Sequence, residues 1–169
     1  DQYKFSTWRR LWIVLAEAQR ELGLPAITHD QIEEMRHFQD TINFDAARAY
    51  EKKLRHDVMS HIHAYGDQCP KARPIIHLGA TSAYVQDNTE LIQMREGLRI
   101  IFTKLVNIVS ALSNQALKYK DLATLSFTHF QPAQPTTLGK RMCLWIQDYL
   151  LDIEEVELRI TGLRFHGVK

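Results

Sequence analysis

Apolar residues recur at intervals of three and four along most of the chain, which is the spacing of one face of an α-helix. No segment of consequence alternates with the period of a β-strand, and residues 123–127 are at most a short extended piece. We therefore predict an all-α fold. The expected helices cover residues 6–22, 28–38, 44–65, 87–119 and 135–163.

Local signals predict where several of these helices begin and end. Gly23 stops the first helix, and Gly66 can cap the third. Thr28 and Gln31 are spaced as a capping box, in which each side chain bonds the backbone N–H of the other residue. Residues 87–90 have a second capping signature, so the longest helix is expected to begin there.

The longest helix exceeds what a compact domain of this size needs. At a rise of 1.5 Å per residue, about thirty residues would extend about 45 Å. Sustained apolar spacing over that length is typical of a bundle or of coiled packing between subunits.

A polar stretch, SFTHFQPAQPTTLGKR at residues 126–141, separates the two longest apolar segments. Its one histidine, His129, is flanked by Thr128 and Gln131, and Pro135 suits the first turn of the following helix. We expect His129 on an irregular segment just before a helix N-terminus. Backbone N–H groups and the helix dipole can hold an anion at such a place.

A second polar group, Arg55, His56 and Asp57, falls inside the third predicted helix. Consecutive residues of a helix point in different directions, so the three cannot all face a core. Taken alone, the segment is better explained as a solvated face on which Asp57 pairs with His61, four residues on. Zinc is less expected, because His56, His61 and His63 lack the usual pairing of helical metal ligands.

A third polar group follows a loop over residues 68–82, in which Gly79 permits a tight turn. Thr81 and Ser82 stand at the expected start of a short helical turn. Their hydroxyls and the free N–H groups suit a carboxylate or a phosphate. Simple N-capping is the commoner use of such residues.

Composition narrows the classes of function. With 45% hydrophobic residues, 24% charged residues and a net charge of +1, the chain is an ordinary globular sequence with no nucleic acid or membrane as its expected partner. Cys69 and Cys143 share no metal-type spacing, which predicts reduced thiols in the cytoplasm. No apolar run approaches a membrane span, and no signal peptide is evident.

Together the polar groups offer donors and cations for a polyanionic small molecule, and imidazoles that move protons near neutral pH. On these grounds an enzyme is only modestly favoured over a non-catalytic helical oligomerisation module.

Three blocks carry a resemblance to a known family. RHDVM at 55–59, IIHLGATS at 75–82 and THFQPAQPTTLGKR at 128–141 resemble the adenylosuccinate lyases of the fumarase/aspartase superfamily, in that order. The resemblance implies a homotetramer with active sites shared between three subunits, and no cofactor or metal. The implied reaction is β-elimination of fumarate from adenylosuccinate, giving AMP, and from succinylated aminoimidazole carboxamide ribotide. Residues 1–82 would form the N-terminal helical domain, and 83–169 the truncated start of the central helical bundle.

The resemblance also implies roles for the first two blocks. The nucleotide would be held by Arg55, His56 and Asp57. The succinyl carboxylate would be bound by Thr81 and Ser82.

In the third block, His129 would be the general acid that protonates the leaving nitrogen, and Thr128 would help to bind the substrate. The family's general base, a serine in a block like SSAMPYKRNP, is missing from this sequence, as are its Arg-Tyr pair and its downstream arginines. His166 stands where an arginine is expected. We therefore expect an N-terminal fragment that is inactive alone. Argininosuccinate lyase or a cycloisomerase is the alternative enzyme, although the RHD triplet suits a nucleotide.

Overall fold

The computed structural model describes residues 1–168, which form two compact units. The first unit contains Asp1–Gln93 and residues 165–168, and the second contains Met94–Arg164. Helix α5, Ser82–Lys118, begins in the first unit and continues in the second. The units are described separately below.

The first unit is built on four helices and the start of α5. They are α1 (Gln2–Glu21), α2 (His29–His37), α3 (Phe44–Leu54) and α4 (Asp57–Gln68). Aromatic and aliphatic side chains from all of these except α3 meet in one core, whose fully buried members include Trp8, Trp12, Met35, Val58, Tyr65 and Val85.

The predicted ends of the first two helices are largely confirmed. The capping box of Thr28 and Gln31 is present in both directions. Helix α1 starts at Gln2, four residues before the predicted start. Contacts of Phe5 account for the extra turn, because its ring stacks on His61 at 3.7 Å and packs edge-on against Trp8 at 5.0 Å.

The single helix predicted over residues 44–65 is wrong, because the chain breaks at Arg55 and His56. Arg55 adopts a left-handed conformation with φ of 56° and closes α3 by donating its N–H to the Glu51 carbonyl. His56 is extended and accepts the Met59 N–H at the start of α4. Gly66, predicted as a cap, lies inside α4. The apolar pattern continues across the break, so periodicity alone could not show it.

The predicted start of the longest helix also needs correction. Residues 87–90 do not cap α5, because the helix already begins at Ser82. Its first turns are buried in the core through Val85, Asn88 and Thr89. The expected tight turn at Gly79 is confirmed by its φ of +72°.

The second unit contains a β-hairpin that the apolar pattern did not predict. Strand β1 (Ala123–Thr128) pairs antiparallel with β2 (Gln131–Thr137), leaving a two-residue turn. Pro135 therefore lies in β2 opposite Leu125, not in the first turn of a helix. Helix α6 (Leu138–Gly162) follows, with the Thr137 side chain accepting the Lys140 N–H. The prolines and polar residues of β2 hid the strand.

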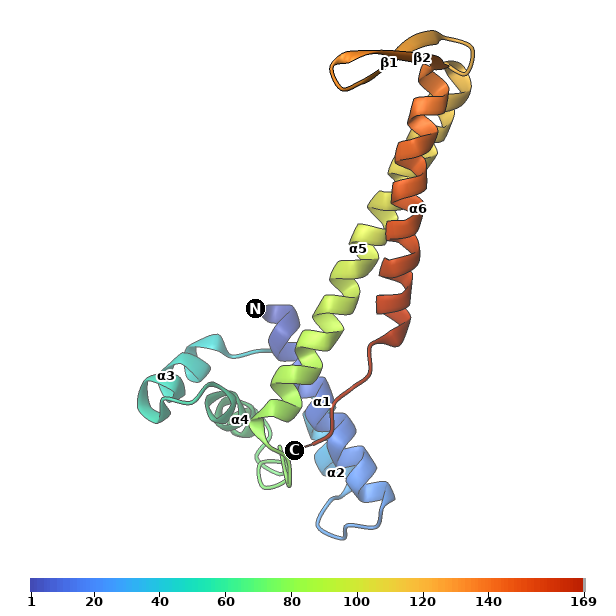
Figure 1. Cartoon of the computed structure of the whole chain (residues 1–169). Helices are drawn as coiled ribbons and strands as arrows, with labels where there is room; N and C mark the ends of the chain where they lie inside the picture. Colours follow the sequence, from blue (N-terminus) through green and yellow to red (C-terminus); the bar gives the residue numbers. More distant parts are fainter. Residues whose placement is uncertain (169) are drawn as a thin grey trace. The chain divides into compact units, whose positions relative to one another are not determined.

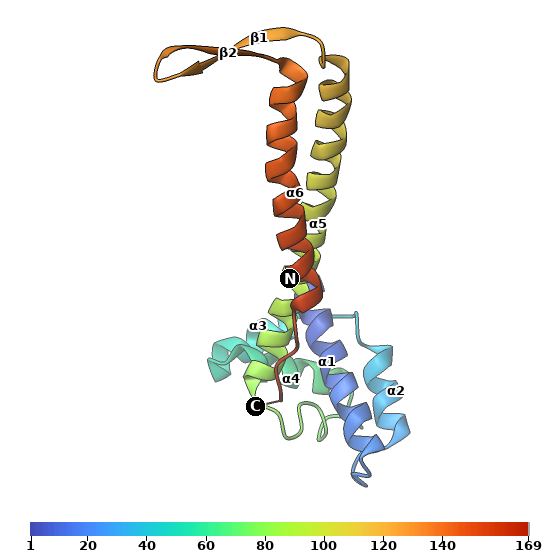
Figure 2. The same cartoon turned by 45° about the vertical axis from the view of Figure 1, so that its right-hand side comes forward.

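Within this unit, α6 runs antiparallel to the later part of α5, and the hairpin joins them at one end (Figures 1 and 2). At the hairpin end, the Gly139 N–H donates to the Tyr119 carbonyl at 2.9 Å. At the other end, Arg95 donates to the Leu163 carbonyl at 2.9 Å. Both ends of the helix pair are therefore fixed by hydrogen bonds.

Many apolar side chains of the helix pair are exposed. Within the described residues, α5 is the one helix long and apolar enough to cross a membrane, with a window of mean hydropathy 1.3 that is 6% buried. The expectation that no apolar run approaches a membrane span is wrong in this respect. Length and composition alone are weak evidence of a span, because core helices of soluble proteins have the same properties. Exposed members of the pair include Met94, Ile100, Ile101, Leu144, Trp145 and Leu151.

Candidate functional site

Backbone strain is concentrated in the three sequence blocks. Among the described residues, the non-glycine residues with positive φ are Arg55, His77, His129 and Phe130. One lies in RHDVM, one in IIHLGATS and two in THFQPAQ. Such conformations cost of order 1 kcal/mol or more each and tend to persist at functional sites.

The break between α3 and α4 presents Arg55, His56 and Asp57 on an exposed surface. Because His56 and Asp57 begin α4, both lie at its positive dipole end. The His56 Nδ1 atom is 3.6 Å from the Asp57 carboxylate. Asp57 also accepts from its neighbour's backbone N–H and, at 2.9 Å, from the side-chain amide of Gln86.

The start of α5 comes close to this break. The Ser82 hydroxyl lies 3.5 Å from His56 Nε2, a long contact whose direction depends on the tautomer. The structure therefore brings His56, Asp57 and Ser82 together, as the sequence predicted for one site. Thr81 differs, because its N–H donates to the Val168 carbonyl at 2.9 Å. Thr81 could bind an anion only through its side chain.

His77 belongs to the same surroundings; it lies in the IIHLGATS block, but the sequence analysis assigned it no role. Its Nδ1 accepts a hydrogen bond from the indole N–H of Trp12 at 3.0 Å. Burial lowers the pKa of His77, and electrostatic repulsion from nearby His56 lowers it further. The signals that mark His77 are its φ of 66° and a partner 65 residues away, and neither is visible in a local motif.

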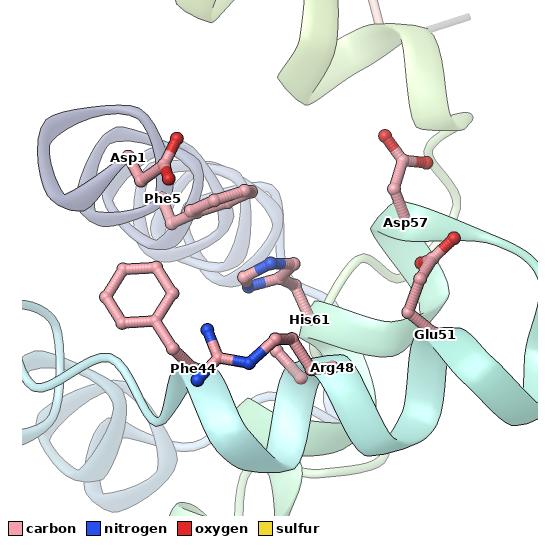
Figure 3. A pocket seen from close by; sticks show the side chains of 8 residues that line it. Asp1, Phe5, Phe44, Arg48, Glu51, Asp57 and His61 are labelled. Atoms are coloured by element: carbon pink, nitrogen blue, oxygen red, sulfur yellow. The ribbon is translucent and has the colours of Figure 1, made fainter.

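The expected surface pair of Asp57 and His61 does not form, because His61 is buried. Its ring stacks on Phe5, and burial is the main cause that lowers its pKa to about 4. His61 and Asp57 line a cavity of about 310 Å³ (Figure 3). The figure shows Phe5 and Phe44 on the apolar side of this cavity, with Arg48, Glu51 and Asp57 around it.

Thr128 and His129 lie at the turn of the hairpin in the second unit. Thr128 pairs with Gln131, and His129 and Phe130 form the turn with φ of 49° and 59°. All four residues are exposed. Two consecutive positive φ values define the type I′ turn, which usually contains Asn-Gly. The hairpin therefore holds an imidazole at its tip, where it is open to a ligand or another chain.

No group of three or more metal-ligating side chains occurs within residues 1–168. The arrangement is instead one of hydrogen-bond donors and imidazoles, which can bind an anion and transfer protons.

A model of the family described as "Lyase" matches residues 17–164. The chain belongs to the lyase family. Two curated relatives of this lyase-family chain are both named adenylosuccinate lyase. One, from Schistosoma mansoni, is 49% identical over 100% of this chain, and the other, from Saccharomyces cerevisiae, is 49% identical over 98% of it. The chain spans about 35% of the length of each.

A solved structure titled fumarate lyase, from Mesorhizobium sp. BNC1, matches the fold with a TM-score of 0.83. The match covers 93% of this chain and 37% of that one, at 23% identity. This likeness confirms the predicted, mainly helical fold class.

Proposed function

We propose that the complete protein is an adenylosuccinate lyase that releases fumarate from adenylosuccinate, leaving AMP, and from succinylated aminoimidazole carboxamide ribotide. The observation that carries this proposal is the placement of every positive-φ non-glycine residue of the described chain in the three blocks. The identity of 49% to relatives named adenylosuccinate lyase supports it. An alternative of a purely structural helical module offers no reason for that placement.

The reaction breaks a carbon–nitrogen bond and moves one proton at each end. A base removes a proton from the carbon beside a carboxylate of the succinyl group, the C–N bond breaks, and an acid protonates the leaving nitrogen. Fumarate and the amino nucleotide are the products. In this proposal His129 supplies the proton to nitrogen, and the base lies outside the 169 residues. The chain alone would then be inactive.

The first unit would bind the charged parts of the substrate. Arg55 and His56, at the break between α3 and α4, would hold the nucleotide, with the Asp57 carboxylate beside the imidazole. Thr81 and Ser82 would bind the succinyl carboxylate through their hydroxyls, because the Thr81 N–H is already occupied. Fixed donors of this kind stabilise the negative charge that develops in the transition state.

Thr128 would contact the substrate beside His129. An exposed hairpin tip suits a site completed by other subunits, and the exposed apolar faces of α5 and α6 suit the homotetramer expected for the family. The proposal includes a cytoplasmic location, no metal or cofactor, and a first domain ending near residue 82.

The experiment is to measure fumarate release by the complete protein carrying His129→Asn. Asparagine tolerates a positive φ, so the turn is kept while the imidazole is lost. We expect turnover to fall by about 10²- to 10⁴-fold with the assembly intact. His29→Asn, at an exposed histidine of α2, is the matched control.

Loss of assembly with His129→Asn would support the structural module instead. Full turnover by the variant would remove His129 from catalysis. Release of fumarate from argininosuccinate but not from adenylosuccinate would point to the alternative lyase.

A further inference from the structure

The only side-chain hydrogen bond to the His77 ring among the described residues comes from Trp12. Both residues belong to the first unit, and Trp12 is 1% exposed. The indole Nε1 donates to Nδ1 of His77 at 3.0 Å, and the two rings meet edge-on at an interplanar angle of 78°. An indole N–H can donate but cannot accept.

This bond decides the protonation of His77. Because Nδ1 accepts, it cannot carry a hydrogen, and the neutral ring must carry its proton on Nε2. Protonating Nδ1 would break the bond and leave its N–H facing the N–H of the buried Trp12 indole. Burial and the neighbouring His56 both lower the pKa of His77, which also favours the neutral ring.

His56 is held in a similar way. Its Nδ1 accepts the Met59 N–H at 3.4 Å, which leaves the proton of the neutral ring on Nε2, toward the Ser82 hydroxyl. Two neighbouring imidazoles therefore use Nδ1 for the protein and keep Nε2–H for their surroundings. A pair of donors suits an anionic ligand, whereas an exposed imidazole lone pair would repel it.

We infer that Trp12 is a positioning residue of the candidate site, whose indole N–H fixes His77 as the tautomer that donates from Nε2 beside His56. The consequence for substrate binding rests on the proposed function. The tautomer of His77 is independent of the proposed function, because it is set by two residues of this chain. Trp12 acts only through His77 and does not touch the reacting atoms.

The matched pair of variants is Trp12→Phe and Trp8→Phe in the complete protein. Both tryptophans are on α1 and fully buried, but the Trp8 indole N–H has no hydrogen-bond partner. Both variants lose the same volume from the core, and only Trp12→Phe loses a hydrogen bond to the site.

The first measurement is nitrogen-15 solid-state NMR of the protein labelled in its histidine imidazoles, with His77→Gln to assign the signal. We expect Nδ1 of His77 to be unprotonated in the wild type and in Trp8→Phe, and to gain protonated population in Trp12→Phe. The second is steady-state kinetics with adenylosuccinate, in which we expect Trp12→Phe to raise KM about fivefold to tenfold and Trp8→Phe by less than about twofold.

An unchanged His77 tautomer in Trp12→Phe would overturn the inference, as would equal KM values for the two variants. If Trp12→Phe does not assemble, benzothienylalanine at position 12 keeps the shape and replaces the N–H by sulfur. It must reproduce the tautomer change for the inference to stand. A changed tautomer in a protein that does not act on adenylosuccinate would leave the role of Trp12 intact and refute the proposed function instead.

Discussion

Gly139 lies at the junction of the hairpin and the helix pair, where the end of α5 closely approaches its backbone. It is buried near the start of α6, where that helix crosses the end of α5. A Cβ atom added there would lie 2.3 Å from the Ala116 carbonyl oxygen and 2.7 Å from the Lys120 Cα atom. Both are backbone atoms, which no rotamer change can move. We therefore predict that Gly139→Ala separates the two helices at the hairpin end.

The size of the effect follows from these contacts. Overpacking costs about 1–3 kcal/mol. Weakening the bond from the Gly139 N–H to the Tyr119 carbonyl adds about 1 kcal/mol. Alanine's better helix propensity returns at most about 1 kcal/mol. The expected net loss is about 1–3 kcal/mol of local stability in the second unit.

Hydrogen exchange followed by mass spectrometry suits this prediction, because it reports local opening in a protein that need not unfold as one unit. Amides of residues 116–140 should exchange faster in Gly139→Ala. The control is Gly97→Ala, on an exposed part of α5 where an added Cβ meets nothing within 4 Å. Gly97→Ala should stabilise this part of α5 by about 0.5–1 kcal/mol and so slow local exchange. Unchanged exchange around the hairpin in Gly139→Ala would show that the close approach does not hold the junction.

Two further predictions concern the core of the first unit. His61 has a pKa lowered to about 4 from 6.5, mainly by burial, so the unfolded chain binds its proton first as pH falls. Stability should decrease as pH drops from 6.5 toward 4, and urea titrations at several pH values should show a smaller decrease for His61→Phe. Arg9 is buried and donates to the carbonyls of Phe38 and Thr41 and to Gln68. Arg9→Lys should cost about 2 kcal/mol or more, because an ammonium cannot span these acceptors, and an unchanged urea midpoint would contradict this.

The helices of this chain were largely predictable because they carry their own signals. The apolar spacing and the capping box at Thr28 are local and were confirmed. The break at Arg55 was not predictable, because the apolar period continues through it and only the backbone leaves the helix. The hairpin was missed because prolines are rare inside strands, and here Pro135 pairs within a two-stranded sheet that has edges on both sides.

The candidate site shows the same division. Motif blocks pointed to His56, Asp57 and Ser82, which the structure brings together. The hydrogen bond between Trp12 and His77 joins residues 65 positions apart, so no local pattern contains it. Candidate site residues can be read from sequence motifs, whereas the partners that orient them depend on the tertiary fold.

The three blocks share one backbone feature, although their sequences are unrelated. Each places a polar side chain on or beside a residue of positive φ, in a turn or loop between elements of regular structure. In the first unit, strain at Arg55 and His77 is opposed by a hydrogen bond to Glu51 and by the buried indole of Trp12. In the second, the cross-strand pairing of β1 and β2 holds the turn at His129. The contacts that hold these strained residues also fix the direction of their side chains, and a ligand that bound there would meet side chains already ordered.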